Sequence, residues 1–286
     1  MIDVTIANGD VALAASLFGG ARGREKRAPL LFLHGIGNAR DTWFDWAMHL
    51  APTQRVLTLD FRGHGHSSRA ARYHLADYVS DAAAALAWLG EPTQVVGHSL
   101  GGVVAGRLAQ FGHPLVRSTL LVDPAWFFGV PEEFARTAYP KRFELLKGTI
   151  APLRAANAPL AAWMEAVGQS PHPWGGVFAD HTPPRLIEAH ASALQRHDVR
   201  CWETAVRDAF GGFDPLTPFQ CPTTVIHADE RYGAALFADQ ADRLAAANPG
   251  VRMRFYEGSD HFPHRSYRFA ERFGGELGAF ASAEGF

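Results

Sequence analysis

The sequence has 286 residues, of which 47% are hydrophobic and 20% are charged, a composition typical of a folded globular protein. Its 27 basic and 29 acidic residues leave a formal net charge of −2, so no strong field favours nucleic acid or an anionic membrane as the main partner. A small, mostly uncharged substrate fits this balance better.

The cysteine content and the lengths of the apolar runs indicate in which cellular compartment the protein is expected. Two cysteines, Cys201 and Cys221, are too few for a disulfide framework and favour a reducing compartment, although one bridge between them stays open. The N-terminal stretch lacks a basic region and its apolar run at 11–18 is short, so we expect no secretory signal. No window approaches the roughly 20 apolar residues that span a bilayer. We therefore expect a cytoplasmic protein.

Short apolar runs alternate with amphipathic stretches along most of the chain. The segment 2–20, with Asn8-Gly9 at its middle, predicts an antiparallel hairpin at a sheet edge. Six further runs predict strands buried on both faces: 29–33, 55–60, 93–97, 118–123, 223–227 and 251–256. Amphipathic segments predict helices at 77–89, 102–111, 237–247 and 267–281. This alternation predicts an α/β fold with a mostly parallel, doubly wound sheet.

The alternation breaks between 125 and 214, where proline and glycine interrupt helical pieces. We interpret this segment as a helical cap, or lid, inserted after the sixth strand, with residues 1–124 and 215–286 forming the core. Among the aromatic residues of the segment, we expect Trp126, Phe127 and Trp163 to contact the substrate.

The strongest motif is Gly97-His98-Ser99-Leu100-Gly101, which matches G-x-S-x-G directly after a buried strand and before an Ala-rich helix. A nucleophile on such a sharp strand-to-helix turn adopts an unfavourable backbone conformation, and flanking glycines let the helix and the strand approach closely. The N-terminus of the helix offers free N–H groups to a developing oxyanion. The motif therefore predicts Ser99 as a nucleophile.

With this motif, the sequence resembles the α/β-hydrolase superfamily over most of the chain outside the cap. His34-Gly35-Ile36-Gly37 stands where the family places its oxyanion loop, so the resemblance implies that the N–H groups of Ile36 and Leu100 form the oxyanion hole. The stretch 60–67 resembles the D-x-R-G-x-G-x-S turn, a structural signature without direct chemistry. The fold implied is the α/β-hydrolase fold with an inserted cap.

A serine hydroxyl needs a base, and the chain order of the family implies His261, in Gly258-Ser259-Asp260-His261-Phe262. His264 is the main alternative to His261 as the base. We expect the side chain of His98 to point away from the nucleophile and His34 to orient the oxyanion loop, while His64 and His66 lie on a turn.

The acid of the triad has two candidates. Most of the family place it after strand seven in a G-x-x-D pattern, but Arg231 occupies that position here, so Asp229 or Glu230 would need a shifted loop to take over the role. Asp123 follows the sixth strand, where zearalenone-type lactone hydrolases and some haloalkane dehalogenases place their acid. Asp123 is our first choice and Asp229 our second.

These residues lead us to expect a serine hydrolase that cleaves a carboxylic ester or lactone of mainly apolar character. The sequence has no H-E-x-x-H, C-x-x-C, G-x-G-x-x-G or P-loop motif, so we expect no metal and no cofactor. Carbon–carbon bond hydrolysis, cofactor-free perhydrolysis and acyl transfer use the same triad and stay open. A non-catalytic ligand receptor built on this fold is a further alternative.

Overall fold

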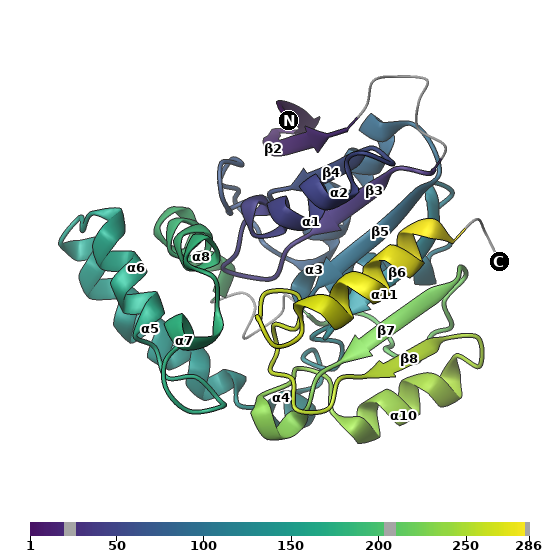
Figure 1. Ribbon diagram of the computed structural model, residues 1–286. Coiled ribbons are helices and arrows are strands. Elements are labelled where there is room, and N and C mark those ends of the chain that lie inside the picture. Colours follow the sequence, from purple (N-terminus) through teal and green to yellow (C-terminus); the bar gives the residue numbers. More distant parts are fainter. Residues whose placement is uncertain (20–26, 203–209, 284–286) are drawn as a thin grey trace.

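The computed structural model describes residues 1–19, 27–202 and 210–283. In this part of the chain, eight strands form one sheet in the order β1-β2-β4-β3-β5-β6-β7-β8 (Figure 1). The strands are β1 Ile2–Asn8, β2 Val11–Phe18, β3 Leu30–Leu33, β4 Val56–Leu59, β5 Thr93–His98, β6 Val116–Val122, β7 Thr223–His227 and β8 Arg252–Phe255. Strands β3 to β8 are mutually parallel, and β2 runs antiparallel to both β1 and β4.

The predicted strands are present, with ends that shift by at most two residues. The predicted burial on both faces is wrong for β8, an edge strand on which Arg252, Arg254 and Phe255 are exposed. The N-terminal hairpin is also confirmed, but its turn lies one position later than Asn8-Gly9. Asn8 pairs with Val11, so Gly9-Asp10 forms the turn, and Gly9 takes the positive φ of 62° that a tight hairpin requires.

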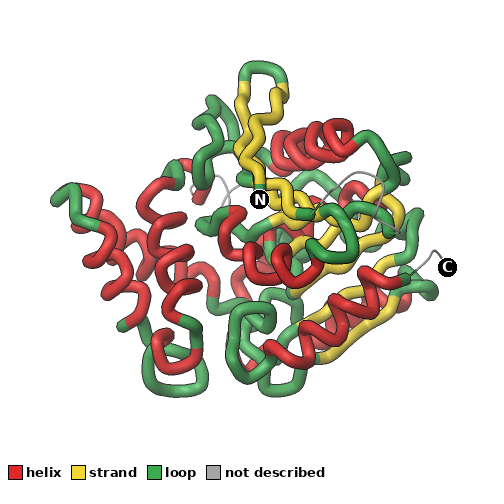
Figure 2. Tube along the Cα trace, turned by 45° about the horizontal axis from the view of Figure 1, so that its top comes forward, coloured by secondary structure: helices red, strands yellow, loops and turns green. Residues whose placement is uncertain are grey.

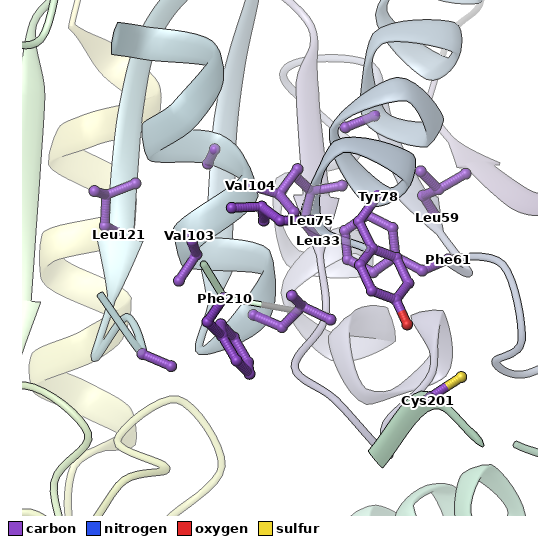
Figure 3. Packing of buried hydrophobic residues seen from close by; sticks show 14 of the residues in the cluster. Leu33, Leu59, Phe61, Leu75, Tyr78, Val103, Val104, Leu121, Cys201 and Phe210 are labelled. Carbon is purple, nitrogen blue, oxygen red and sulfur yellow. The ribbon is translucent and has the colours of Figure 1, made fainter. Parts of the chain in front are cut away.

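Helices cover both faces of the sheet because successive strand residues point to opposite sides. Leu30 and Phe32 of β3 face the core under α1 (Phe44–Leu50) and α11 (Ala270–Ser282). Leu31 and Leu33 face the core under α2 (Leu75–Leu89), α3 (Leu100–Gln110) and α10 (Ala238–Ala247). Figure 3 shows part of this second core, where Val103 and Val104 of α3 pack near Leu33.

The four predicted helices correspond to α2, α3, α10 and α11, whereas the 3₁₀ turn η1 (Arg40–Trp43) and helix α1 were not expected. This part of the chain continues directly from the loop after β3. It carries Trp43, whose ring stacks on Phe32 with the centroids 4.6 Å apart.

The segment between β6 and β7 contains short helices. They are α4 Pro131–Arg136, α5 Tyr139–Ala155, α6 Leu160–Gly168, α7 Phe178–His181 and α8 Pro184–Arg196. Helices α5, α6 and α8 pack on one another and form a layer beside the sheet (Figures 1 and 2). The division of the chain into a core and a separate cap at 125 and 214 stays a prediction. Within the described ranges, no helix is long and apolar enough to cross a bilayer.

Candidate active site

Ser99 lies between β5 and α3, with φ 53° and ψ −114°, a conformation that is unfavourable for a residue with a side chain. Close packing around the turn explains the flanking glycines. A Cβ atom on Gly97 would lie 2.0 Å from the carbonyl oxygen of Gly101, and one on Gly101 would lie 2.3 Å from that of Leu33. The strand–turn–helix packing therefore holds Ser99 in its strained position.

The loop after β3 lies directly against Ser99. A Cβ atom on Gly35 would lie 2.8 Å from Nδ1 of the buried His98 ring and 3.1 Å from the Cβ atom of Ser99, so this position favours glycine. Leu100 is the first residue of α3, and its N–H therefore has no carbonyl partner one turn earlier in the helix. The structure thus places the loop that carries Ile36 and the N-terminus of α3 beside the same serine.

His261 and Asp123 form a buried pair, with Nδ1 of His261 2.6 Å from Oδ2 of Asp123. Asp123 follows β6 at a positive φ of 39° and is fully buried. Its carboxylate also accepts backbone N–H bonds from Ala235 at 2.8 Å, Ala228 at 3.1 Å and Leu236 at 3.3 Å. These donors fix the carboxylate, which in turn holds Nδ1 of His261, so that Nε2 is the ring nitrogen on the side away from Asp123.

Burial shifts the pKa values of both partners toward their neutral forms. It lowers the pKa of His261 well below the ordinary value, and nearby Arg142 acts in the same direction. Burial raises the pKa of Asp123, and the three backbone N–H donors oppose that rise. The imidazole of His261 is therefore neutral near pH 7, the form that can accept a proton.

Asp229 has other partners. Its carboxylate binds the Arg231 side chain, with Nη2 to Oδ2 at 2.6 Å, and accepts the N–H of Gly258 at 2.8 Å. It also caps the 3₁₀ turn η2 (Glu230–Tyr232) by accepting the N–H of Arg231. The hydrogen bonds to Arg231 lower the pKa of Asp229 to about 2. Asp229 thus holds the turn that precedes His261, whereas Asp123 contacts the imidazole itself.

The other histidines near the site have structural contacts. Nε2 of His98 lies 3.0 Å from the carbonyl oxygen of His261, on the backbone of the His261 loop. His264 stacks on Trp43 with the ring centroids 4.5 Å apart. In His34, Nδ1 lies 2.8 Å from the carbonyl oxygen of Gly35, and Nε2 accepts the N–H of Phe61 at 3.1 Å. Among the described residues, no three His, Cys, Asp or Glu side chains are grouped to hold a metal ion.

Comparison with known proteins gives the family. The profile of the alpha/beta hydrolase family matches residues 30–272, which is most of the chain. The chain belongs to the α/β-hydrolase family. The strand order and the strained serine turn described above agree with that membership.

The curated relatives of this α/β-hydrolase align with different fractions of its length. It is 41% identical over 100 residues to the dihydrolipoyllysine-residue acetyltransferase component of the acetoin cleaving system of Cupriavidus necator, which covers 34% of this chain and 27% of that protein. It is 29% identical over 250 residues to an uncharacterized protein of Mycobacterium tuberculosis, covering 82% of this chain and 70% of the relative. The chain therefore spans 27% and 70% of the lengths of these relatives.

Among solved structures, the α/β-hydrolase resembles the esterase RhEst1 from Rhodococcus sp. ECU1013. The two superpose with a TM-score of 0.76 over 100% of both chains at 22% sequence identity. At this identity the likeness concerns the fold.

The three residues expected to contact substrate have other contacts in this α/β-hydrolase. Trp126 donates its indole N–H to the carbonyl oxygen of Pro215 at 2.8 Å and packs where a Cβ atom on Gly106 would be. The ring of Phe127 lies under the guanidinium of Arg243, 4.8 Å from its Cζ. Trp126 and Phe127 thus pack against α3 and α10 because the chain turns back over the core directly after Pro124, and their contact with substrate stays a prediction.

Trp163 also packs internally. It is 2% exposed within α6 and donates its indole N–H to the carbonyl oxygen of Ala158 at 3.3 Å. These contacts belong to the interior of the helical layer, and the contact of Trp163 with substrate stays a prediction.

Three other aromatic residues, which the sequence did not single out, reach from His261 to the oxyanion loop. The ring centroid of Tyr139 lies 5.2 Å from that of His261 and 5.8 Å from that of Phe143. Phe143 stacks on Trp202 at 6.2 Å, and a Cβ atom on Gly37 would lie 2.8 Å from the Trp202 ring. We call Tyr139, Phe143 and Trp202 the aromatic wall. The spacing of Tyr139 and Phe143, four residues apart on α5, was the one available sequence signal.

Proposed function

We propose that the chain is a serine hydrolase that cleaves a carboxylic ester or a lactone through an acyl-enzyme on Ser99. The observation that carries the proposal is the 2.6 Å contact between Nδ1 of His261 and the buried carboxylate of Asp123. A histidine held in this way by a carboxylate has the tautomer and orientation of a general base. The strained turn at Ser99 and the neighbouring oxyanion loop supply the remaining parts.

In the proposed reaction, Oγ of Ser99 attacks the carbonyl carbon while Nε2 of His261 takes the hydroxyl proton. The N–H groups of Ile36 and Leu100 stabilise the oxyanion of the tetrahedral intermediate. Collapse of the intermediate breaks the bond to the alcohol oxygen, which leaves with the proton from His261. A water molecule, deprotonated by His261, then attacks the acyl-enzyme and releases the carboxylic acid and Ser99.

The aromatic wall favours a small, mainly apolar substrate. Tyr139, Phe143 and Trp202 belong to the segment between β6 and β7, so this segment would act as a cap that covers the acyl or alcohol group.

Cys201 and Cys221 are both free thiols, which supports the proposed cytoplasmic location.

The test uses a short p-nitrophenyl ester, with wild type compared with Ser99→Ala. We expect a burst of nitrophenol stoichiometric with the wild-type enzyme, followed by turnover, and neither in the variant. Activity that survives in Ser99→Ala would overturn the proposal. An inactive wild type would also count against ester hydrolysis and would direct the screen to carbon–carbon bond hydrolysis, perhydrolysis, acyl transfer or ligand binding without turnover.

A further inference from the structure

The orientation of the peptide between Gly35 and Ile36 is fixed from its carbonyl side. The carbonyl oxygen of Gly35 lies 2.8 Å from Nδ1 of His34 and accepts the backbone N–H of Asn38 at 3.1 Å. The C=O and N–H groups of a trans peptide point in opposite directions. Whatever holds Asn38 in place therefore also determines where the N–H of Ile36 points.

The side chain of Asn38 is a buried junction of hydrogen bonds. Its Oδ1 accepts Nη1 of Arg265 at 2.8 Å and lies 2.8 Å from Nδ1 of His190, while Nδ2 donates to the carbonyl oxygen of Ile36 at 3.4 Å. Arginine can only donate, so the atom that faces Arg265 must be the amide oxygen. Asn38 is 4% exposed. If His190 or Arg265 lost its N–H donor, the buried Oδ1 of Asn38 would lose one of its two hydrogen bonds.

The junction connects three segments that lie far apart in the sequence. Asn38 belongs to the oxyanion loop, His190 to helix α8, and Arg265 to the loop four residues after His261. Arg265 is 6% exposed and also donates from Nη2 to the carbonyl oxygen of Leu186 on α8, at 3.5 Å. The oxyanion loop is thus linked both to the helical layer and to the segment that carries the proposed base.

We propose that Asn38 is a positioning residue of the oxyanion hole, through which His190 and Arg265 keep the Gly35–Ile36 peptide in its catalytic orientation. This inference rests on the proposed function, because it assigns the N–H of Ile36 to the oxyanion. Helix α8 then acts on the chemistry through the His190 side chain and through the Leu186 carbonyl that binds Arg265, without contact with the reacting atoms.

The first test measures kcat and KM for the p-nitrophenyl ester in Asn38→Leu, His190→Phe and Arg265→Met. Misdirection of one oxyanion donor lowers kcat, by about 10- to 100-fold, and leaves KM within about threefold. Asn38→Asp keeps acceptor oxygens for His190 and Arg265 but loses the N–H donor to the carbonyl oxygen of Ile36, so its kcat lies between those of wild type and Asn38→Leu. The double variant Asn38→Leu/His190→Phe is no slower than Asn38→Leu alone, because His190 acts through Asn38.

Arg185→Met is the matched control. Arg185 also joins α8 to the core, through an ion pair with Asp45, and its partner Asp45 lies on α1 and not on the oxyanion loop. We expect kcat of Arg185→Met within about twofold of wild type, as for a surface ion pair of small energetic value. Equal losses of kcat in Arg185→Met and His190→Phe would overturn the inference.

Hydrogen–deuterium exchange of the peptide 34–38 separates this inference from the proposed function, because it needs no substrate. Exchange in this peptide becomes faster in Asn38→Leu, His190→Phe and Arg265→Met and stays unchanged in Arg185→Met. Unchanged exchange in the first three variants would overturn the inference even if wild type is an active esterase. Faster exchange in an enzyme without esterase activity would support the positioning role and reject the proposed reaction.

Discussion

The side chains of His261 and Asp123 meet at 2.6 Å although 138 residues separate them in the sequence. Sheet order explains the contact, because Asp123 directly follows β6, His261 lies in the loop after β8, and both strands run parallel to β7, which lies between them. The loops that follow both strands emerge at the same edge of the sheet, where the backbone of Ala228 also binds Asp123.

Asp123→Asn tests this pair, with Asp229→Asn as the matched variant. Loss of the orienting carboxylate lowers kcat by about 10⁴-fold, because His261 takes the wrong tautomer. Asp229→Asn weakens the contact with Arg231 and the turn at Gly258, so we expect a lower melting temperature with kcat within about tenfold of wild type. A larger loss of kcat in Asp229→Asn than in Asp123→Asn would reverse our assignment of the acid.

The pH dependence of kcat/KM reports the protonation of His261 in the free enzyme. Burial lowers the pKa of His261 below its ordinary value of 6.5, and only the neutral imidazole accepts the proton of Ser99. Activity is therefore lost as the pH falls through this lowered pKa, and we expect the midpoint of the acid limb to lie below 6.5. Circular dichroism at each pH serves as the control for folding. A midpoint above 6.5 would contradict the prediction.

Gly101→Ala tests the packing of the serine turn. The added methyl group would lie 2.3 Å from the backbone carbonyl oxygen of Leu33, which cannot move away without shifting β3. We expect the free energy of unfolding to fall by about 1–3 kcal/mol, measured by urea denaturation. Gly148→Ala on α5 is the control, because a Cβ atom there meets nothing within 4 Å and alanine favours the helix by about 0.5–1 kcal/mol. Equal stability of the two variants would refute the packing argument.

Phe143→Ala tests the aromatic wall. Because Phe143 lies between Tyr139 and Trp202, its removal should reduce apolar contact with a long acyl group and spare a short one. We expect kcat/KM to fall about tenfold for a hexanoate ester and to stay within about threefold for an acetate ester. Phe127→Leu, which alters packing near Arg243, should reduce both by the same factor. A uniform loss in Phe143→Ala would argue against contact with the acyl group.

The sequence by itself located most of the sheet and the residues of the serine turn, because these depend on short-range patterns. Apolar runs mark strands that are buried on both faces, and G-x-S-x-G marks a turn at which Gly97 and Gly101 must lack side chains. The helix α1 was missed because it is only seven residues long and follows an irregular loop.

Only the tertiary structure decided which side chains meet. From the sequence, Asp123 and Asp229 both follow strands at the same edge of the sheet, and only the fold places the first on His261 and the second on Arg231. It likewise placed Tyr139, which the sequence did not single out, beside His261, and it brought Arg265 to Asn38 across 227 residues. Such contacts depend on how strands are ordered and how helices pack, and no local pattern in the sequence encodes that arrangement.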